Sequence, residues 1–337
     1  MTPPTLPEAL ILMGREAFEA QFDAQRLDRL RSLATLGDPV WTGDLDDSGL
    51  AERLASVQVL LTGWGAPRLT ASRLERMPLL QAMFHCAGTI RPHVTEEFWE
   101  RGVLASNAAD ANAIPVAEFA FAAIVMAGKK APFLAAAARD RRDVAVDAFG
   151  GLGNLARTIG IVGFSRIGRK VVQLVQQLED VHCLVSDPHA DPLEVAAAGA
   201  ELVELDEMLP RLDVLSLHAP QLPSTHNMIG ANELAALPPH ATVINTARGS
   251  LIDTAALERE CASGRLNAII DVTEPEPLPA GSVLYDLPNV MVTPHIAGSL
   301  GSELHRLTDG ALDELARFVR GEPLRAELSR DDLLLGA

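Results

Sequence analysis

Three ionisable residues follow consecutive predicted strands in the second half of the chain: Arg248 in INTARGS, Glu276 in DVTEPEP and His295 in TPHIAGS. An arginine offers a fixed fork of donors that suits a carboxylate and a neighbouring carbonyl. A histidine can pass a hydroxyl proton near neutral pH, and a glutamate bonded to it would stabilise the imidazolium. Together these residue types predict hydride transfer at an alcohol or ketone carbon beside a carboxylate, with His295 as acid and base.

A glycine-rich turn precedes these residues in the sequence. The predicted strand over 158–162 runs into this turn and then into a helix over 169–178. In that context, helix N-terminal amides and the positive end of the helix dipole bind a pyrophosphate. We expect Gly163 to allow the tight turn and Gly168 to allow close packing of the helix. Ser165 stands where a glycine normally lies, which leaves open either weaker binding or a compensating hydrogen bond from its hydroxyl.

Asp187 follows the next predicted strand. An acidic side chain at this place accepts hydrogen bonds from the adenosine ribose and repels a 2′-phosphate, which favours NAD over NADP. The alternative is an ordinary turn at 163–168, with Asp187 capping a helix that begins near Pro192. The register of Asp187 with the turn favours the dinucleotide interpretation.

The sequence resembles the D-isomer-specific 2-hydroxyacid dehydrogenase family over nearly its whole length. The residues that carry the resemblance are GIVGFSRIG (160–168), Asp187, LHAP (217–220), INTARG (244–249), IDVTEPEP (270–277) and TPHIAGS (293–299), with RGVLASNA (101–108) and VAE (116–118). The resemblance implies that Arg248, Glu276 and His295 are the catalytic residues. It also implies that NAD is the cofactor.

The resemblance further implies which residues contact the cofactor and the substrate. The expected cofactor-binding residues are Gly163, Ser165, Arg166, Ile167, Gly168, Asp187, His218, Thr225, Thr246, Ala247 and Asp271, the last at the nicotinamide carboxamide. The expected substrate-binding residues are Ala87, Gly88 and Thr89, whose backbone amides would hold a carboxylate, with Trp64 and Arg248. A packing role remains the alternative for His218. The loop departs from the family pattern after Gly88, and Arg91 is either a partner for a second anionic group or a plain rim residue.

Short apolar runs rich in β-branched residues alternate with helical patterns along the chain. They lie at 9–13, 57–61, 80–84, 158–162, 182–186, 213–217, 241–245, 267–271 and 290–293. This alternation predicts βαβ units with parallel sheets, and hence the α/β class. One long apolar helix is predicted from Val116 to Ala138, with Pro115 suited to its first turn, and an amphipathic helix over 302–319 is expected to return the chain to the first sheet.

These elements predict two domains. A doubly wound Rossmann NAD-binding domain is expected over 113–299, and a discontinuous flavodoxin-like substrate-binding domain over 1–112 and 300–337, with the substrate in the cleft between them. The short sequence after the returning helix predicts no appended regulatory domain.

Composition argues against several classes of protein. The 337 residues are 48% apolar and 22% charged, as in a soluble globular chain, and a net charge of −17 argues against nucleic acid as a partner. The three cysteines, Cys86, Cys183 and Cys261, are widely spaced without a CxxC, which predicts neither disulfides nor a metal site and favours a reducing cytoplasm. The other histidines show no ligand spacing, so no metal is predicted. The longest apolar stretch, 119–127, is too short for a membrane span.

The sequence leaves two functions open. The leading one is an NAD-dependent oxidoreductase that interconverts a D-2-hydroxy acid and its 2-oxo acid, such as phosphoglycerate or the glyoxylate and hydroxypyruvate pairs, as a homodimer built around the cofactor domains. The alternative is an NAD(H)-sensing interaction protein of the same fold, which Ser165 and the altered substrate loop keep open. Retention of all three catalytic residues weighs against the alternative. The sequence leaves open which acid is used, whether it is phosphorylated, and the direction of the reaction.

Overall fold

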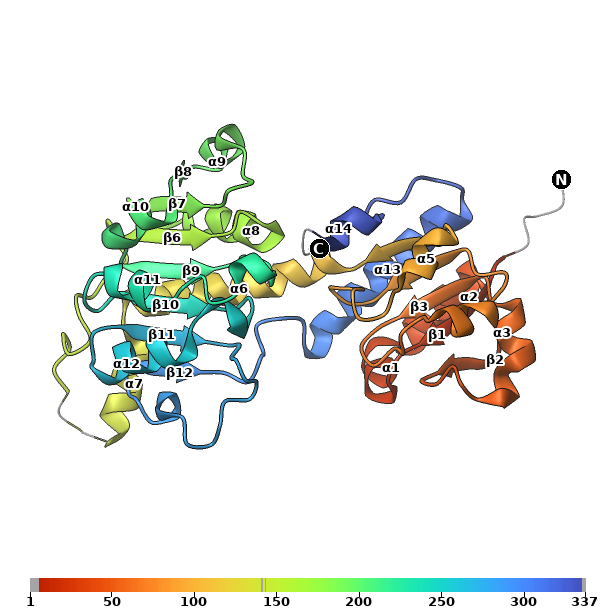
Figure 1. Ribbon diagram of the computed structural model, residues 1–337, viewed down its shortest axis with the longest axis horizontal. Helices are drawn as coiled ribbons and strands as arrows, with labels where there is room; N and C mark the ends of the chain where they lie inside the picture. Colours follow the sequence, from red (N-terminus) through yellow and green to blue (C-terminus); the bar gives the residue numbers. More distant parts are fainter. Residues whose placement is uncertain (1–5, 141, 143, 335–337) are drawn as a thin grey trace. The chain divides into compact units, whose positions relative to one another are not determined.

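The computed structural model describes residues 6–140, 142 and 144–334. The chain divides into two compact units (Figure 1): unit 1 comprises Met1–Asn112 and Ser299–Ala337, and unit 2 comprises Ala113–Gly298. The sequence predicts the same first boundary, after residue 112, and a second boundary after residue 299. Both units are built on parallel sheets flanked by helices, which confirms the predicted α/β class.

Unit 2 contains a seven-stranded parallel sheet in the order β12-β11-β10-β9-β6-β7-β8. Its strands are β6 (Thr158–Val162), β7 (His182–Ser186), β8 (Glu201–Leu202), β9 (Val214–Leu217), β10 (Thr242–Asn245), β11 (Asn267–Ile270) and β12 (Val290–Val292). This is the doubly wound arrangement, in which the strand order reverses between β6 and β9. Ligands bind such sheets beyond the carboxyl ends of the strands, next to that reversal.

Helices cover both faces of the unit 2 sheet. They are α6 (Ala109–Gly128), α7 (Ala131–Asp140), α8 (Arg166–Val175), α9 (Pro192–Ala197), α10 (Leu205–Met208), α11 (Ala231–Ala236) and α12 (Thr254–Ala262). Neighbouring residues of one strand enter opposite cores: Val243 packs with Leu234 and Leu257, whereas Ile244 packs in the cluster that contains Ile124 and Val172. Burial on both faces explains why these strands are apolar at every position.

Unit 1 contains a five-stranded parallel sheet in the order β2-β1-β3-β4-β5, which is the flavodoxin-like order. Its strands are β1 (Glu8–Leu12), β2 (Thr35–Thr42), β3 (Val59–Thr62), β4 (Ala82–His85) and β5 (Leu104–Asn107). Its helices are α1 (Arg15–Gln21), α2 (Ala24–Leu33), α3 (Ala51–Ser56), α4 (Ala71–Glu75), α5 (Glu96–Glu100), α13 (Leu304–Val319) and α14 (Arg330–Leu334).

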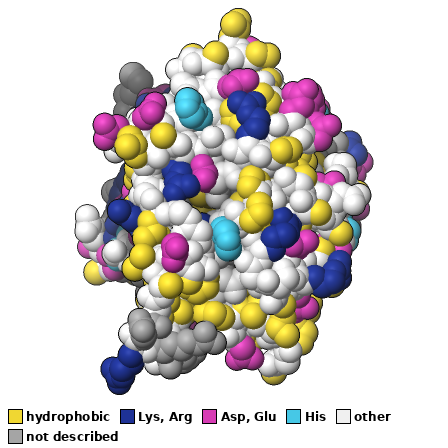
Figure 2. Space-filling view, turned by 90° about the vertical axis from the view of Figure 1, so that its left-hand side faces the viewer, with side chains coloured by type: hydrophobic (Ala, Val, Ile, Leu, Met, Phe, Trp, Pro, Cys, Tyr) yellow, Lys and Arg dark blue, Asp and Glu magenta, His cyan; other side chains and the backbone are white. Residues whose placement is uncertain are grey.

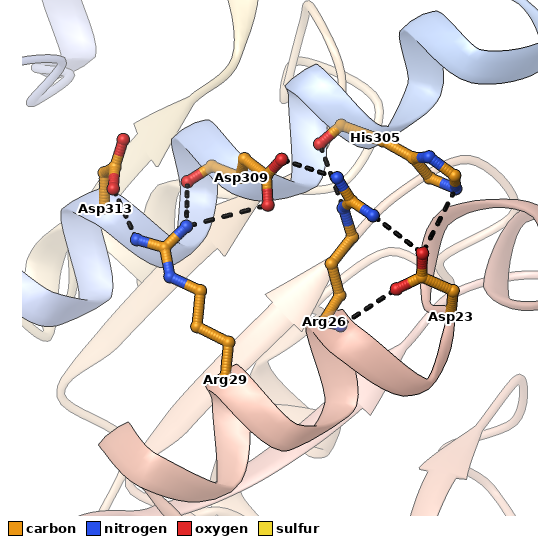
Figure 3. Close-up of polar contacts among 6 residues, drawn as sticks. All are labelled: Asp23, Arg26, Arg29, His305, Asp309 and Asp313. Atoms are coloured by element: carbon orange, nitrogen blue, oxygen red, sulfur yellow. Dashed lines mark hydrogen bonds and ion pairs between the residues drawn. The ribbon is translucent and has the colours of Figure 1, made fainter.

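The returning helix α13 belongs to the core of unit 1. Its Leu312 and Leu315 pack with Ile11, Leu61 and Phe84 from three strands of the sheet. Figure 3 shows the ion pairs that join α13 to α2 at the surface of this core. Arg26 of α2 pairs with Asp309 of α13 at 2.6 Å and with Asp23 at 2.8 Å, and Arg29 pairs with Asp309 and Asp313. The C-terminal segment is thereby fixed to the N-terminal part of the chain.

Three strands are absent from the predicted set. The edge strand β2 contains Gly37 and Pro39. Both weaken the sequence signal for a strand, because glycine has no side chain to pack and proline has no N–H to donate. The strand β8 has only two residues, too few for any pattern to show. The strand β5 is short and mostly small or polar, so it lacks the apolar run by which the other strands are predicted.

The single helix predicted over 116–138 is wrong, because two helices occupy this region. Helix α6 ends at Gly128, and Lys130 takes a left-handed backbone conformation with φ 51° before α7 begins. The ammonium group of Lys130 donates to the carbonyl of His240 at 2.8 Å and to Oγ1 of Thr242 at 3.1 Å, which fixes the break. Pro115 lies inside α6 and not in its first turn.

Helix α6 is also longer than the apolar stretch 119–127 that the sequence analysis considered. In the described part of the chain, this helix alone is long and apolar enough to cross a membrane by length and composition. Half of its most apolar window is buried, and Ala120 and Ile124 pack in the core of unit 2. Length and composition are weak evidence here, since the core helix of a globular domain meets the same test.

Candidate active site

The candidate residues of unit 2 lie just beyond the carboxyl ends of its strands. Gly163 follows β6, Asp187 follows β7 and His218 follows β9. Thr246, Ala247 and Arg248 follow β10, Asp271 follows β11, and His295 lies just beyond β12. The topology therefore places these residues along one edge of one sheet, the edge at which doubly wound folds bind ligands.

The two glycines of the turn are required by close backbone approach. Gly163 has φ 94°, and a Cβ atom on it would lie 2.7 Å from the backbone nitrogen of Ala219. A Cβ atom on Gly168 would lie 2.0 Å from the carbonyl oxygen of Gly163. The backbone of the turn therefore packs too closely for a side chain at either glycine, and this glycine cradle leads directly into α8, as in a pyrophosphate site.

Ser165 caps the helix that follows the turn. Its hydroxyl accepts from the amide of Gly168 at 3.3 Å and donates to the carbonyl of His218 at 2.9 Å. Its φ of −72° makes no demand for glycine. The hydroxyl therefore forms hydrogen bonds within the protein, and it secures the start of α8, whose first-turn amides have no acceptor within the helix itself.

Asp187 contacts the glycine-rich turn directly. Its Oδ2 accepts from the amide of Phe164 at 2.8 Å, and its Oδ1 accepts from the amide of His189 at 2.9 Å. The alternative in which Asp187 caps the helix near Pro192 is wrong, because Asp191 caps α9 by accepting from Leu193 at 2.8 Å. The carboxylate is half-buried beside the turn, so its remaining lone pairs can accept from a ribose.

Two buried polar atoms at this edge have no partner in the described part of the chain: Nδ1 of His218 and Oγ1 of Thr246. Nε2 of His218 lies 2.9 Å from Oγ of Ser216, and burial lowers the pKa of His218 to about 3, so the ring is neutral. Buried polar groups without partners are costly unless a ligand or water satisfies them. These atoms, together with the glycine cradle, fit a polar dinucleotide.

Thr225 and Ala247 make contacts within their own loops. The hydroxyl of Thr225 donates to the carbonyl of Pro220 at 2.7 Å and accepts from the amide of Leu222 at 2.9 Å. It therefore closes the short turn after β9. Ala247 is buried, and its amide donates to Oδ1 of Asn245 at 3.0 Å.

His295 and Glu276 form a direct pair. Nδ1 of His295 donates to Oε1 of Glu276 at 2.6 Å, and both side chains are about half exposed. His295 has φ 56°, and its amide is shared between the carbonyls of Asp271 at 2.9 Å and Thr293 at 3.0 Å. The two hydrogen bonds of its amide stabilise this left-handed backbone conformation. The hydrogen bond between Nδ1 and Glu276 leaves Nε2 of the imidazole available to another partner.

Asp271 organises the loop that carries His295. Its buried carboxylate accepts from Oγ1 of Thr293 at 2.6 Å and from the amides of Ile296 and Ala297 at 2.8 Å each. Sequence reasoning placed Asp271 only at the nicotinamide carboxamide. In the structure its carboxylate holds both sides of His295, which the sequence pattern does not reveal.

Arg248 is held by a residue that the sequence analysis did not single out. Asn245, the last residue of β10, donates from Nδ2 to the carbonyl of Arg248 at 2.8 Å while accepting from Ala247. The side chain of Arg248 reaches the surface, yet the surrounding loops desolvate the guanidinium and lower its pKa, an effect that the nearby Glu276 carboxylate opposes. The only signal for Asn245 was its place in the INTARG motif.

The remaining candidates lie in unit 1, beyond the carboxyl ends of β3 and β4. Trp64 is 43% exposed, whereas Ala87 is buried and Gly88 and Thr89 are partly exposed. Burial raises the pKa of the neighbouring Cys86 thiol to about 12, which indicates a packing residue. Arg91 is exposed, and its amide donates to Oγ1 of Thr89 at 3.3 Å.

Figure 2 shows one face of the molecule, on which the described Lys and Arg side chains are interspersed with Asp and Glu. Within residues 6–140, 142 and 144–334, no three His, Cys, Asp or Glu side chains are grouped so that they could hold a metal ion.

Comparisons with known proteins agree on one family. Residues 121–297 match the family model described as D-isomer specific 2-hydroxyacid dehydrogenase, NAD binding domain. The chain is 30% identical over 295 residues to a D-3-phosphoglycerate dehydrogenase of Mycobacterium tuberculosis, an alignment that covers 86% of this chain and 55% of the relative. It is 36% identical over 169 residues to a glycerate dehydrogenase of Methylorubrum extorquens, covering 49% of this chain and 51% of the relative. The chain thus spans about half the length of these relatives.

Solved structures show the same fold along nearly the whole chain. The TT0316 protein of Thermus thermophilus is similar with a TM-score of 0.73 and 27% identity, over 96% of this chain and all of that one. The D-mandelate dehydrogenase of Rhodotorula graminis is similar with a TM-score of 0.80 and 24% identity, over 96% of this chain and 98% of that one. The second likeness concerns the fold alone.

Proposed function

Because the chain belongs to the D-isomer specific 2-hydroxyacid dehydrogenase family, we propose that it is an NAD-dependent oxidoreductase that interconverts a D-2-hydroxy acid and its 2-oxo acid. The observation that carries the proposal is the His295–Glu276 pair, with 2.6 Å between Nδ1 and Oε1, on the ligand-binding edge of the NAD-binding unit. Arg248 supplies a cation near this pair.

NAD, when bound, accepts the hydride from the hydroxy acid, and its reduced form donates the hydride to the 2-oxo acid. In the reducing direction, Nε2 of protonated His295 gives its proton to the substrate oxygen as the carbonyl carbon gains the hydride. Glu276 orients the ring through Nδ1 and stabilises the imidazolium. The guanidinium of Arg248 binds the substrate carboxylate and polarises the adjacent carbonyl.

The cofactor is assigned to the turn and strand ends of unit 2. Gly163, Ser165, Arg166, Ile167 and Gly168 form the pyrophosphate cradle. The ribose is assigned to Asp187, and the remaining contacts to His218, Thr225, Thr246, Ala247 and Asp271. Substrate contacts in unit 1 are assigned to the amides of the loop containing Ala87, Gly88 and Thr89, and to Trp64.

The names of the relatives indicate which acids to test first. Phosphoglycerate and glycerate dehydrogenases are among the curated proteins that this chain resembles. We therefore propose phosphohydroxypyruvate, hydroxypyruvate and glyoxylate as first candidates for the 2-oxo acid. Three buried free cysteines fit a reducing compartment, and we place the protein in the cytoplasm as a homodimer joined through its NAD-binding units.

The test is turnover by the purified protein with NADH and NADPH against these acids, pyruvate and bulkier 2-oxo acids. We expect oxidation of NADH with at least one acid. His295→Ala should lower kcat by about 100-fold or more, the usual contribution of a general acid, while the Kd for NADH stays unchanged. Tight NADH binding by the wild-type protein without turnover on any acid would favour the NAD(H)-sensing function instead. Undiminished turnover by His295→Ala would remove this residue from the mechanism.

A further inference from the structure

The substrate loop of unit 1 is tied down by its carbonyl groups. Nε2 of Gln21, a fully buried side chain in α1, donates to the carbonyl of Cys86 at 3.2 Å. The amide of Ala108 donates to the carbonyl of Ala87 at 2.9 Å. Two successive peptide groups are therefore oriented by donors that lie inside unit 1.

A third peptide group of the loop is oriented by His85, the last residue of β4. The ring is 1% exposed, and its Nδ1 lies 2.8 Å from Oγ1 of Thr62 on β3. Burial, aided by the neighbouring His93, lowers the pKa of His85 to about 3, and a hydrogen bond to the backbone of Thr89 acts in the opposite direction. A backbone group that favours the protonated ring must be an acceptor, so the ring donates to the carbonyl of Thr89.

The tautomer of His85 follows from these two contacts. A neutral imidazole has one N–H, and the carbonyl of Thr89 can only accept. The proton therefore lies on Nε2, and the hydroxyl of Thr62 donates to Nδ1. Both ring nitrogens are satisfied, which a buried imidazole requires.

The opposite side of the loop consists of amides. In a trans peptide the N–H points away from the C=O of the same group. The amides of Ala87, Gly88 and Ile90 therefore point away from Gln21, the amide of Ala108 and His85, respectively. These three amides have no acceptor in the part of the chain that the structure describes. Neighbouring N–H groups of this kind form a concave site for an anion.

We propose that His85 and Gln21 are positioning residues that turn these amides toward the carboxylate of the substrate. This inference rests on the proposed function, since it deepens the role of the same loop. Neither side chain touches the reacting atoms. Gln21 holds the carbonyl of Cys86 and His85 holds the carbonyl of Thr89. Because the loop is already ordered, binding of the carboxylate does not have to offset the entropy of ordering it.

The kinetic test compares two substitutions at His85. His85→Met fills similar space but cannot donate to Thr89, whereas His85→Gln can place an amide N–H near the position of Nε2. We expect His85→Met to raise KM for the 2-oxo acid about tenfold, a factor typical of one lost hydrogen bond, with a smaller change in kcat and an unchanged Kd for NADH. His85→Gln should recover most of the KM. An unchanged KM in His85→Met, or equal impairment in both variants, would overturn the proposal.

A second readout does not depend on turnover. Backbone hydrogen exchange at Cys86 and Ala108, whose amides donate to the carbonyls of Thr62 and Ala87, should become faster in His85→Met and in Gln21→Met than in the wild-type protein, and stay near wild type in His85→Gln. If the wild-type protein turns over no 2-oxo acid, the proposed function fails. The exchange measurement then tests by itself whether His85 and Gln21 hold the loop. Exchange rates that neither methionine variant alters would show that the two side chains do not hold the loop.

Discussion

Asp187 connects cofactor choice with the stability of the glycine-rich turn, because its carboxylate accepts from the amide of Phe164 at 2.8 Å. We expect Asp187→Ser to weaken NADH binding and to shift preference toward NADPH, since the charge that repels a 2′-phosphate is lost. The same change should lower the free energy of unfolding by about 1–3 kcal/mol, because a buried donor loses its acceptor. Fluorescence titrations with both cofactors and urea unfolding measure the two effects.

Asp187→Asn is the matched control for this pair of effects. Its side-chain oxygen can still accept from Phe164, so most of the stability should remain, while discrimination against NADPH should fall. If Asp187→Ser and Asp187→Asn both prefer NADH as strongly as the wild-type protein does, Asp187 does not bind the adenosine ribose.

The single residues that sequence reasoning could identify are those whose chemistry shows in their type and place. Arg248, Glu276 and His295 lie in motifs that follow strands. In the structure, Nδ1 of His295 lies 2.6 Å from Oε1 of Glu276. The residues that hold them in place gave no such signal. Asn245 and Asp271 act through contacts with loop backbone, and such contacts depend on how separate loops meet in space.

Helix α8 depends on its N-cap residue, Ser165. Ser165 accepts from the amide of Gly168 at 3.3 Å, so Ser165→Ala should lower the free energy of unfolding by about 1 kcal/mol. Ser165→Gly should cost only a few tenths of a kcal/mol, because glycine is tolerated at a helix N-cap. Urea unfolding of both variants checks the order. Equal stability of the alanine and wild-type proteins would mean that the hydroxyl adds nothing to this helix.

The junction of α6 and α7 should give a measurable pH dependence through Lys130. Burial lowers the pKa of its ammonium group to about 8 from an ordinary value of 10.5. Between these two values the unfolded chain binds more protons than the folded one, so the free energy of unfolding rises with pH across this interval. Lys130→Met should lack this contribution. From pH 8 to 10.5, we expect the free energy of unfolding of the wild-type protein to rise relative to that of Lys130→Met.

Unfolding in urea at several pH values measures this difference. Lys129→Met is a suitable control, because Lys129 is exposed and precedes the junction. A difference for Lys130→Met that is independent of pH would mean that the folded protein does not perturb this lysine.

Element boundaries were predictable where periodicity and burial agreed. The strand over 158–162 is buried on both faces and was predicted with its observed bounds. The break between α6 and α7 was not, since alanine-rich sequence on both sides continues a helical pattern. The bonds from Lys130 to His240 and Thr242 that fix the break join residues over a hundred positions apart.

At the scale of the whole molecule, helix α6 leaves part of an apolar surface uncovered. Met126 is 40% exposed, Ala122 is exposed, and Phe119 and Val125 are partly exposed. These positions recur with helical spacing, so they form one stripe along the helix. Water-exposed stripes of this kind are typical of interfaces between subunits.

We therefore expect the wild-type protein to sediment as a dimer and Met126→Glu to sediment as a monomer, because the dimer would bury an unpaired charge. Leu193→Glu is the control: Leu193 is 79% exposed on α9, outside this stripe, and the same substitution there should leave the dimer intact. Thermal unfolding distinguishes dissociation from loss of fold, since a correctly folded Met126→Glu monomer still unfolds cooperatively. A wild-type protein that sediments as a monomer at all concentrations would contradict the interface, and dissociation by both variants would place it elsewhere.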